Sequence, residues 1–140
     1  MSRNGPIIIV DDDPDDQLLA KEVITSIGMT NKILPFHTAL EALDYLMNDM
    51  LEQPFVILSD INLPRMNGIE LKKAIAANEE LSKRAIPFVY YSTSGEKSIV
   101  DKAFDLQVQG FFVKANSLDE MRKTFKVIFE YWRLSRHPNN

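Results

Sequence analysis

The chain has 140 residues, no cysteine, a formal net charge of −4 and 45% apolar residues. This length suits one globular domain, which we expect to span residues 1–140, with a core at about 6–133 and a short tail at 134–140. The acidic balance argues against direct nucleic-acid binding, and the absence of cysteine excludes disulfides and thiolate chemistry. Neither a signal peptide nor a membrane-spanning run is visible, so we expect a cytoplasmic protein without membrane contact.

Five short apolar runs are predicted to be β-strands, and a helical pattern follows each of them. Strands are expected at 7–10, 33–36, 55–59, 87–92 and 110–114, and helices at 14–27, 39–50, 68–79, 95–107 and 117–133. This alternation predicts an α/β fold with a doubly wound, five-stranded parallel sheet. Pro35 marks its run as an edge strand, because proline cannot donate a hydrogen bond to a ladder.

Polar side chains follow these strands at their carboxyl ends, where open parallel sheets bind ligands. Asp11 and Asp12 follow the first strand and Asp60 ends the third, while Ser92 ends the fourth and Lys114 the fifth. Two carboxylates about 4 Å apart repel by roughly 4 kcal/mol at an effective dielectric near 20, so this group needs a compensating cation or a shared proton. Oxygen ligands suit Mg²⁺, and a lysine and a hydroxyl suit a phosphoryl group. An aspartate placed there can act as the nucleophile.

These motifs resemble those of the receiver domains of bacterial two-component response regulators, including the single-domain chemotaxis regulator. The segments that carry the resemblance are "IIIVDD", the D-x-x-L-P-x-M-x-G run that begins at Asp60, "YYSTS" and "FFVK". The resemblance implies the flavodoxin-like (βα)5 fold with strand order 2-1-3-4-5. The first turn, "DDDPDD", is similar to that of small stand-alone receivers encoded beside phytochrome-type sensor kinases.

The resemblance also implies the roles of the residues at the strand ends. Asp60 is expected to be the phosphoacceptor, and Lys114 to pair with the acidic site and the phosphoryl group. Asp11, Asp12 and Asp60 are expected to hold Mg²⁺, with the backbone carbonyl of Asn62 as a further ligand.

A switch between two states is implied by Ser92 and Phe111. In the family, the hydroxyl moves toward the phosphoryl oxygen, and the aromatic residue three positions before the lysine changes rotamer with it. Phe111 holds that position but has no hydroxyl, so its coupling to Ser92 would come from vacated space alone.

Two positions depart from the family pattern. Ala115 replaces the usual proline after the lysine, so the loop that follows is expected to have a trans bond and another shape, or to be strained. Gln107 replaces the glycine that often ends the fourth helix, which is therefore expected to end differently.

The implied function is a phosphorylation-dependent signalling switch and not an enzyme. Its phosphodonor would be a sensor histidine kinase or a histidine phosphotransfer protein. The fourth helix, fifth strand and fifth helix would then change its affinity for an unknown downstream protein or for a second copy of the chain. One alternative is a receiver-like scaffold that works without phosphorylation. Another is a haloacid dehalogenase-like phosphatase, whose two aspartates would be Asp11 and Asp13.

Some of these residues also have simpler interpretations. Asp13, Asp15 and Asp16 are expected to be helix-start residues, since carboxylates favour the first turn, with a minor effect on the field at the metal. A calcium loop from Asp11 to Glu22 is disfavoured because it lacks the turn glycine. In the fifth helix a core stripe is expected at Leu118, Met121, Phe125, Ile128 and Trp132. Partial burial or a homodimer face remains open for Val127, Phe129 and Tyr131.

Overall fold

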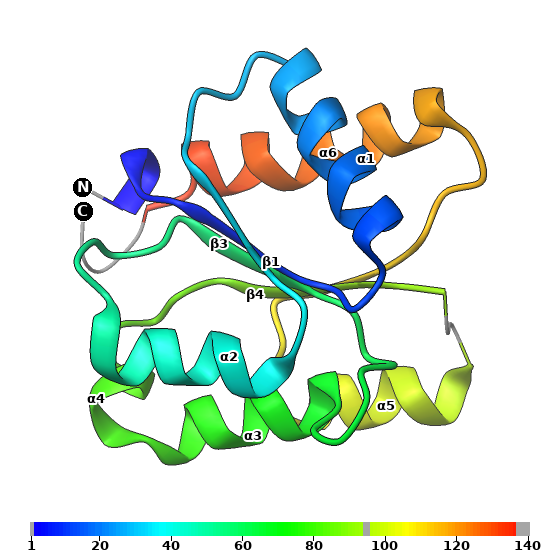
Figure 1. Cartoon of the computed structure of the whole chain (residues 1–140). Coiled ribbons are helices and arrows are strands. Elements are labelled where there is room, and N and C mark those ends of the chain that lie inside the picture. The colour runs from blue at the N-terminus through cyan, green and yellow to red at the C-terminus, as the bar shows by residue number, and fades with distance from the viewer. Residues whose placement is uncertain (1, 94–95, 137–140) are drawn as a thin grey trace.

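The computed structural model describes residues 2–93 and 96–136, in which helices cover both faces of a central sheet (Figure 1). The strands are β1 (Ile7–Val10), β2 (Ile33–Phe36), β3 (Val56–Ser59), β4 (Phe88–Ser92) and β5 (Gly110–Val113). Neighbouring strands are parallel, and their order is β2-β1-β3-β4-β5. The predicted fold class and strand order are therefore confirmed.

The burial of each strand follows its place in the sheet. The inner strands β1, β3 and β4 are buried along their whole lengths, which explains their continuous apolar runs. Strand β2 lies at an edge, as Pro35 predicted, and β5 forms the other edge. Strand β5 ends at Val113, so Lys114 follows the strand instead of ending it.

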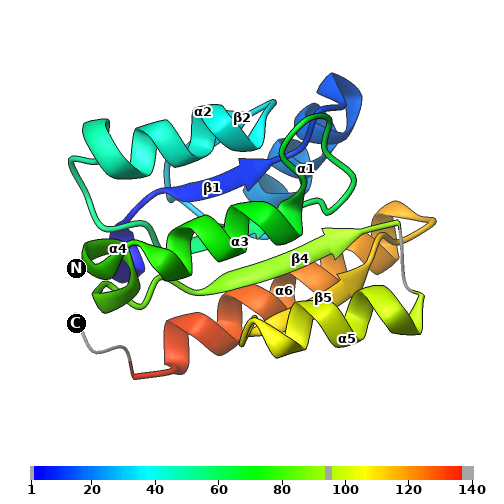
Figure 2. The same ribbon diagram turned by 90° about the horizontal axis from the view of Figure 1, so that it is seen from below.

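The helices form one layer on each face of the sheet (Figures 1 and 2). One layer contains α1 (Pro14–Ser26) and α6 (Leu118–Leu134), and the other contains α2 (Ala39–Asp44), η2 (Tyr45–Asp49), α3 (Gly68–Ala77), α4 (Glu79–Lys83) and α5 (Lys97–Asp105). A short 3-10 helix, η1 (Ser2–Asn4), precedes β1. The predicted fourth and fifth helices are thus α5 and α6. Over the described part of the chain, no helix has the length and apolar character needed to span a membrane.

Two predicted helices are each divided into two pieces. The stretch 39–50 becomes π-helical in its second half, and the stretch 68–79 breaks at Asn78. Asn78 is extended, with φ −85° and ψ 113°, and its side chain accepts the N–H of Leu81. Asparagine in that conformation is a favourable N-cap, so it ends α3 and begins α4. Apolar periodicity continues through this residue and does not reveal the break.

Helix α5 ends in the shape that glycine usually provides, although the residue is Gln107. Its φ is 59°, in the left-handed region. The N–H of Gln107 bonds to the carbonyl of Phe104 at 2.9 Å, and that of Val108 bonds to Ala103 at 3.4 Å. These two bonds form a Schellman motif. The expectation of a different helix end is therefore wrong, and a side chain in this conformation costs about 1–2 kcal/mol.

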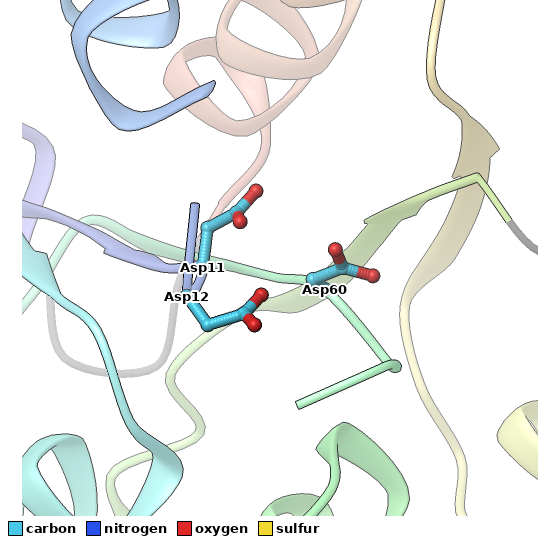
Figure 3. Close-up of side chains that lie close together, drawn as sticks. All are labelled: Asp11, Asp12 and Asp60. Carbon is cyan, nitrogen blue, oxygen red and sulfur yellow. The ribbon is translucent and has the colours of Figure 1, made fainter. Parts of the chain in front are cut away.

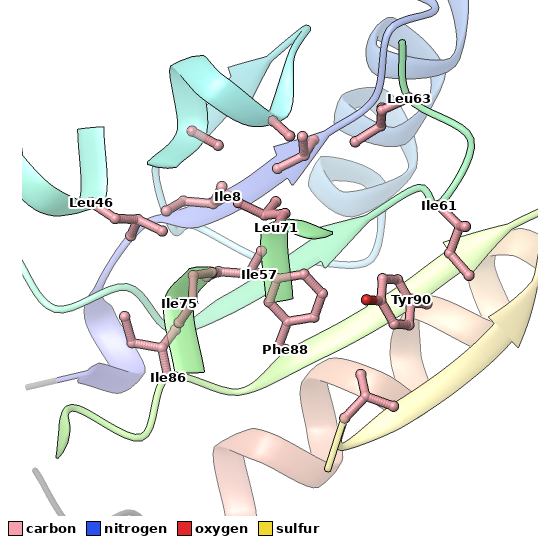
Figure 4. Packing of buried hydrophobic residues seen from close by; sticks show 14 of the residues in the cluster. Ile8, Leu46, Ile57, Ile61, Leu63, Leu71, Ile75, Ile86, Phe88 and Tyr90 are labelled. Carbon is pink, nitrogen blue, oxygen red and sulfur yellow. The ribbon is translucent and has the colours of Figure 1, made fainter. Parts of the chain in front are cut away.

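Alternate residues of each strand enter two separate apolar layers. Ile8 and Ile57 pack toward α2 and α3 (Figure 4), whereas Ile7 and Val56 pack toward α1 and α6. The predicted stripe of α6 is buried at Met121, Phe125 and Ile128. It is wrong at its first position, because Leu118 is 47% exposed. Phe129 is fully buried instead of partly buried, while Val127 and Tyr131 are exposed.

Candidate functional site

Backbone hydrogen bonds bring the residues that follow β1, β3 and β5 to one edge of the sheet. The N–H of Asp60 donates to the carbonyl of Val10 at 2.9 Å, and Asp11 is the next residue after Val10. The N–H of Lys114 donates to the carbonyl of Ser92 at 2.8 Å. These bonds extend the ladders beyond the strands, so neighbouring strands hold the backbone of Asp60 and of Lys114.

Three carboxylates meet at this edge, from Asp11, Asp12 and Asp60 (Figure 3). One oxygen of each lies within 4.8 Å of the others, and Asp11 and Asp60 are buried while Asp12 is exposed. Burial raises the pKa of Asp11 above its usual value, although Lys114 opposes this shift. Oxygen donors gathered in this way fit a hard divalent cation, which would offset their mutual repulsion. The cluster could therefore hold a divalent metal.

Lys114 links three carboxylates at the same edge. Its Nζ lies 2.8 Å from Asp11 Oδ2, 2.8 Å from Asp16 Oδ2 and 3.2 Å from Asp60 Oδ2. Burial acts to lower the pKa of Lys114, but the hydrogen bonds and charges of these aspartates outweigh burial, and the net pKa is raised. The ammonium is thus held in its charged form.

The contact of Asp16 with Lys114 was not predicted from the sequence, where Asp16 was expected to start a helix and to have a minor effect on the field at the metal. Asp16 is the third residue of α1, and side chains in a helix tilt toward its N-terminus. Position and tilt together could have indicated a carboxylate facing the strand end. Asp13 does start the helix, because its Oδ1 accepts the N–H of Asp15 at 2.9 Å. The calcium-loop alternative is wrong, because residues from Pro14 to Glu22 are helical.

The second oxygen of Asp60 is surrounded by hydrogen-bond donors. Asp60 Oδ1 accepts from Ser92 Oγ at 2.7 Å, from the N–H of Ile61 at 2.7 Å and from the N–H of Asn62 at 3.3 Å. Ser92 is fully buried. The hydroxyl that was expected to move toward a phosphoryl oxygen is therefore already bonded to the carboxylate. The predicted role of the Asn62 carbonyl stays a prediction.

Gly68 allows the loop after Asp60 to fold back against it. A Cβ at Gly68 would lie 2.3 Å from the backbone oxygen of Asp60 and 2.9 Å from the Cα of Ile61. The N–H of Gly68 donates to the carbonyl of Ile61 at 2.9 Å, and its carbonyl accepts from the hydroxyl of Tyr90 at 2.7 Å. Only a residue without a side chain fits this close approach, which explains the glycine of the D-x-x-L-P-x-M-x-G run.

Phe111 lies on β5 next to Tyr90 and is half-buried. The two ring centroids are 5.8 Å apart, and Tyr90 is itself fully buried. Tyr90 is two residues before Ser92 on β4. Phe111 therefore packs against the strand that carries Ser92, the other predicted switch residue. The switch role of Phe111 stays a prediction.

Ala115 continues the chain after Lys114 through a trans bond, because the described residues contain no cis peptide bond. Its N–H donates to the hydroxyl of Tyr91 at 3.1 Å. Proline has no N–H and could not make this bond. Tyr91 and Ala115 line the same pocket as Asp60 and Lys114, so this contact fixes the loop beside the site.

Known proteins share this fold and are similar to this chain in sequence. The family model described as the response regulator receiver domain matches residues 7–126. The probable methanogenesis regulatory protein FilR2 of Methanothrix harundinacea is 30% identical over 90% of this chain and 82% of its own length.

Two solved structures of response regulators are also similar. The phosphorylated cyanobacterial phytochrome response regulator RcpA superposes with a TM-score of 0.84 at 27% identity, covering 95% of this chain and 97% of RcpA. The Mn²⁺-bound form of the response regulator Rcp1 superposes with a TM-score of 0.80 at 26% identity, covering 95% and 98% of the two chains. With its five-stranded sheet and acidic edge, this chain therefore belongs to the family of response regulator receiver domains.

Proposed function

We propose that this receiver domain is a phosphorylation-switched signalling module whose phosphoacceptor is Asp60. The observation that carries the proposal is the surroundings of that carboxylate. One oxygen of Asp60 faces the Lys114 ammonium at 3.2 Å, and the other accepts from the Ser92 hydroxyl at 2.7 Å. Positive charge and fixed donors of this kind stabilise the charge that develops on a transferring phosphoryl group.

The phosphodonor in the proposal is a phosphohistidine on a sensor kinase or on a histidine phosphotransfer protein. A carboxylate oxygen of Asp60 attacks phosphorus and forms the O–P bond while the P–N bond breaks. The imidazole nitrogen leaves with the bonding electron pair and gains a proton from solvent. Lys114 and Ser92 hold the phosphoryl oxygens by hydrogen bonds. The domain turns over no other substrate, apart from slow hydrolysis of its own acyl phosphate.

The metal in the proposal is Mg²⁺. The side chains of Asp11, Asp12 and Asp60 would hold it, together with the backbone carbonyl of Asn62. When bound, the ion supplies positive charge next to the phosphoryl oxygens. The all-oxygen donor set supports this choice, and so does the Mn²⁺-bound structure of Rcp1.

In the proposal, phosphorylation of Asp60 moves Ser92 and Phe111, and this movement changes the surface formed by α5, β5 and α6. Apolar side chains are exposed on these three elements: Phe104 is 51%, Val113 55% and Tyr131 61% exposed. Such side chains suit a protein partner, either a downstream target or a second copy of the chain. Phosphorylation would change the affinity for that partner.

Intact-protein mass spectrometry after incubation with acetyl phosphate tests the proposal. We expect one phosphoryl adduct on the wild type that requires Mg²⁺ and is absent from Asp60→Asn. The matched control is Asp49→Asn, which removes the charge of an exposed aspartate outside the site and should leave the adduct unchanged. An adduct that survives in Asp60→Asn would contradict the site assignment.

The alternative functions predict other outcomes in the same experiment. A phosphorylation-independent scaffold would form no adduct as a folded wild type and would still bind its partner as Asp60→Asn. A phosphatase would need Asp13 beside Asp11 as its acid or base. Instead, Asp13 caps α1 through Asp15, and the backbone N–H of Asp13 donates to Asp11 Oδ1 at 3.0 Å. This arrangement favours the receiver function over the phosphatase.

A further inference from the structure

Asp16 contacts Lys114 as closely as the predicted metal ligand Asp11 does. Its Oδ2 lies 2.8 Å from Lys114 Nζ, whereas Asp60 Oδ2 lies 3.2 Å away. The side chain of Lys114 is only 12% exposed, and that of Asp16 is 41% exposed. The contact joins α1 to the loop after β5, and both residues line one pocket with Asp60. Asp16 is thus part of the site, although the motifs give it no role.

The hydrogen-bond capacity of lysine defines what this contact does. An ammonium group has three N–H donors and no acceptor. Asp11, Asp16 and Asp60 each offer one oxygen to Lys114, so the three contacts account for all three donors. The longest of them goes to Asp60, which is also the group that changes when a phosphoryl group is added. The two shorter contacts can keep the ammonium in place while the third donor changes its acceptor.

We propose that Asp16 is a positioning residue for phosphoryl transfer to Asp60, acting through Lys114. The inference rests on the proposed function of Asp60. Asp11 and Asp16 hold the ammonium from the β1 side, and the remaining N–H points to Asp60 and then to a phosphoryl oxygen. With acetyl phosphate, the O–P bond to Asp60 forms as the bond from phosphorus to the acetate oxygen breaks, and acetate leaves with the electron pair. Without Asp16, the ammonium loses one of its two short contacts and its position beside Asp60.

Asp15 is the matched control for this proposal. It precedes Asp16 in the first turn of α1, carries the same charge and is exposed. Among residues 2–93 and 96–136, Asp15 takes part in no ion pair, whereas Asp16 pairs with Lys114. Replacing either residue removes one negative charge, which lies in the first turn of α1 close to the metal cluster. A difference between the two variants therefore isolates the contact with Lys114.

The kinetic test compares Asp16→Ala, Asp16→Asn and Asp15→Ala by the rate of Asp60 phosphorylation with acetyl phosphate. Each protein is measured at a Mg²⁺ concentration that saturates its own rate, so that altered metal affinity does not enter. We expect Asp16→Ala to be about tenfold slower than Asp15→Ala, within the loss that a misplaced catalytic group causes. Asp16→Asn keeps an acceptor oxygen and should recover part of the rate. Equal rates for Asp16→Ala and Asp15→Ala would overturn the proposal.

A second readout does not depend on phosphorylation. In protein with isotope-labelled lysine, the NMR signal of the Lys114 ammonium is observable when its N–H groups are bonded and sheltered, and Lys114→Met assigns it. We expect the signal in the wild type and in Asp15→Ala, and its loss in Asp16→Ala. An unchanged signal in Asp16→Ala would overturn the proposal. A wild type that takes up no phosphoryl group would overturn the proposed function, while this signal would still show whether Asp16 holds Lys114.

Discussion

Ser92 and Asp60 are already joined in this structure, with Ser92 Oγ donating to Asp60 Oδ1 at 2.7 Å. A phosphoryl group on Asp60 would therefore redirect an existing bond instead of attracting a distant hydroxyl. Ser92 is fully buried at the end of β4, and the Tyr90 ring on the same strand lies against Phe111. We therefore propose that a movement of Ser92 would reach Phe111 through the packed ring of Tyr90.

This path gives a first prediction about the switch. Phosphorylation of the wild type should change the NMR signals of the Phe111 ring, whereas Ser92→Ala should take up the phosphoryl group with little change at Phe111. The reason is that alanine has no hydroxyl to follow the phosphoryl oxygen. Thr93→Ala, at the exposed neighbouring position, is the control and should behave like the wild type. If the Phe111 signals changed as much in phosphorylated Ser92→Ala as in the phosphorylated wild type, the response of Phe111 would not depend on Ser92.

A second prediction concerns the charge of Asp12. Its carboxylate lies near those of Asp11 and Asp60, and it is exposed. Without metal, Asp12→Asn should increase the free energy of unfolding by about 1 kcal/mol, the size of one like-charge contact in water. With excess Mg²⁺ the wild type should instead be more stable than Asp12→Asn, because the ion stabilises only a protein that binds it. Urea unfolding with and without Mg²⁺ measures both effects.

The control for this prediction is Asp15→Asn, at an exposed position outside the cluster. It should change the metal-free stability less than Asp12→Asn and keep the stabilisation by Mg²⁺. If Asp12→Asn lost stability in the absence of metal, like-charge repulsion would not govern this cluster.

A third prediction follows from the raised pKa of Asp11. Its usual value is 3.8, and burial raises it in the folded protein. The folded state therefore binds this proton more tightly than the unfolded state. The resulting stabilisation is complete below 3.8 and is lost as the pH rises through the raised folded pKa. In Asp11→Asn the amide at this position does not ionise, so the variant should gain stability relative to the wild type as the pH rises toward neutral.

The measurement for Asp11 is urea unfolding of both proteins in a metal chelator, from acid to neutral pH. The difference in their free energies of unfolding should increase with pH and then level off. A difference that does not vary with pH would mean that the pKa of Asp11 is the same in the folded and unfolded protein.

A fourth prediction concerns Gly68. Gly68→Ala would place a methyl group 2.3 Å from the backbone oxygen of Asp60, which cannot move without distorting the site. We expect a loss of about 3 kcal/mol in the free energy of unfolding, together with slower phosphorylation. Gly110→Ala is the comparison, since its Cβ would meet the end of the Phe112 side chain at 3.1 Å. Similar losses for the two variants would contradict this account of the Gly68 loop.

A fifth prediction concerns the hydrogen bond from the Ala115 N–H to the Tyr91 hydroxyl, at 3.1 Å. Tyr91→Phe removes the acceptor and Ala115→Pro removes the donor, and each should lower the free energy of unfolding by about 1 kcal/mol or more. Because both changes remove one bond, the double variant should lose less than the sum of the two. Strictly additive losses, measured by urea unfolding, would show that the bond contributes nothing.

The sequence by itself determined the sheet, its edge strand β2 and the grouping of Asp11, Asp12, Asp60 and Lys114 at the strand ends. These features depend on local patterns: apolar runs define buried strands, Pro35 excludes an inner position, and parallel strands place their carboxyl ends at one edge. The break at Asn78 was missed, because a cap residue interrupts a helix without interrupting its apolar periodicity.

Only the tertiary structure decided which side chains meet within the site. Asp16 and Lys114 are 98 positions apart, and their contact depends on how α1 packs beside the loop after β5. The bond from Ser92 to Asp60, the bond from Ala115 to Tyr91 and the burial of Phe129 likewise depend on packing between distant segments. A local pattern fixes where a strand or helix lies in the chain, but side-chain contacts depend on the distances that packing sets between such elements.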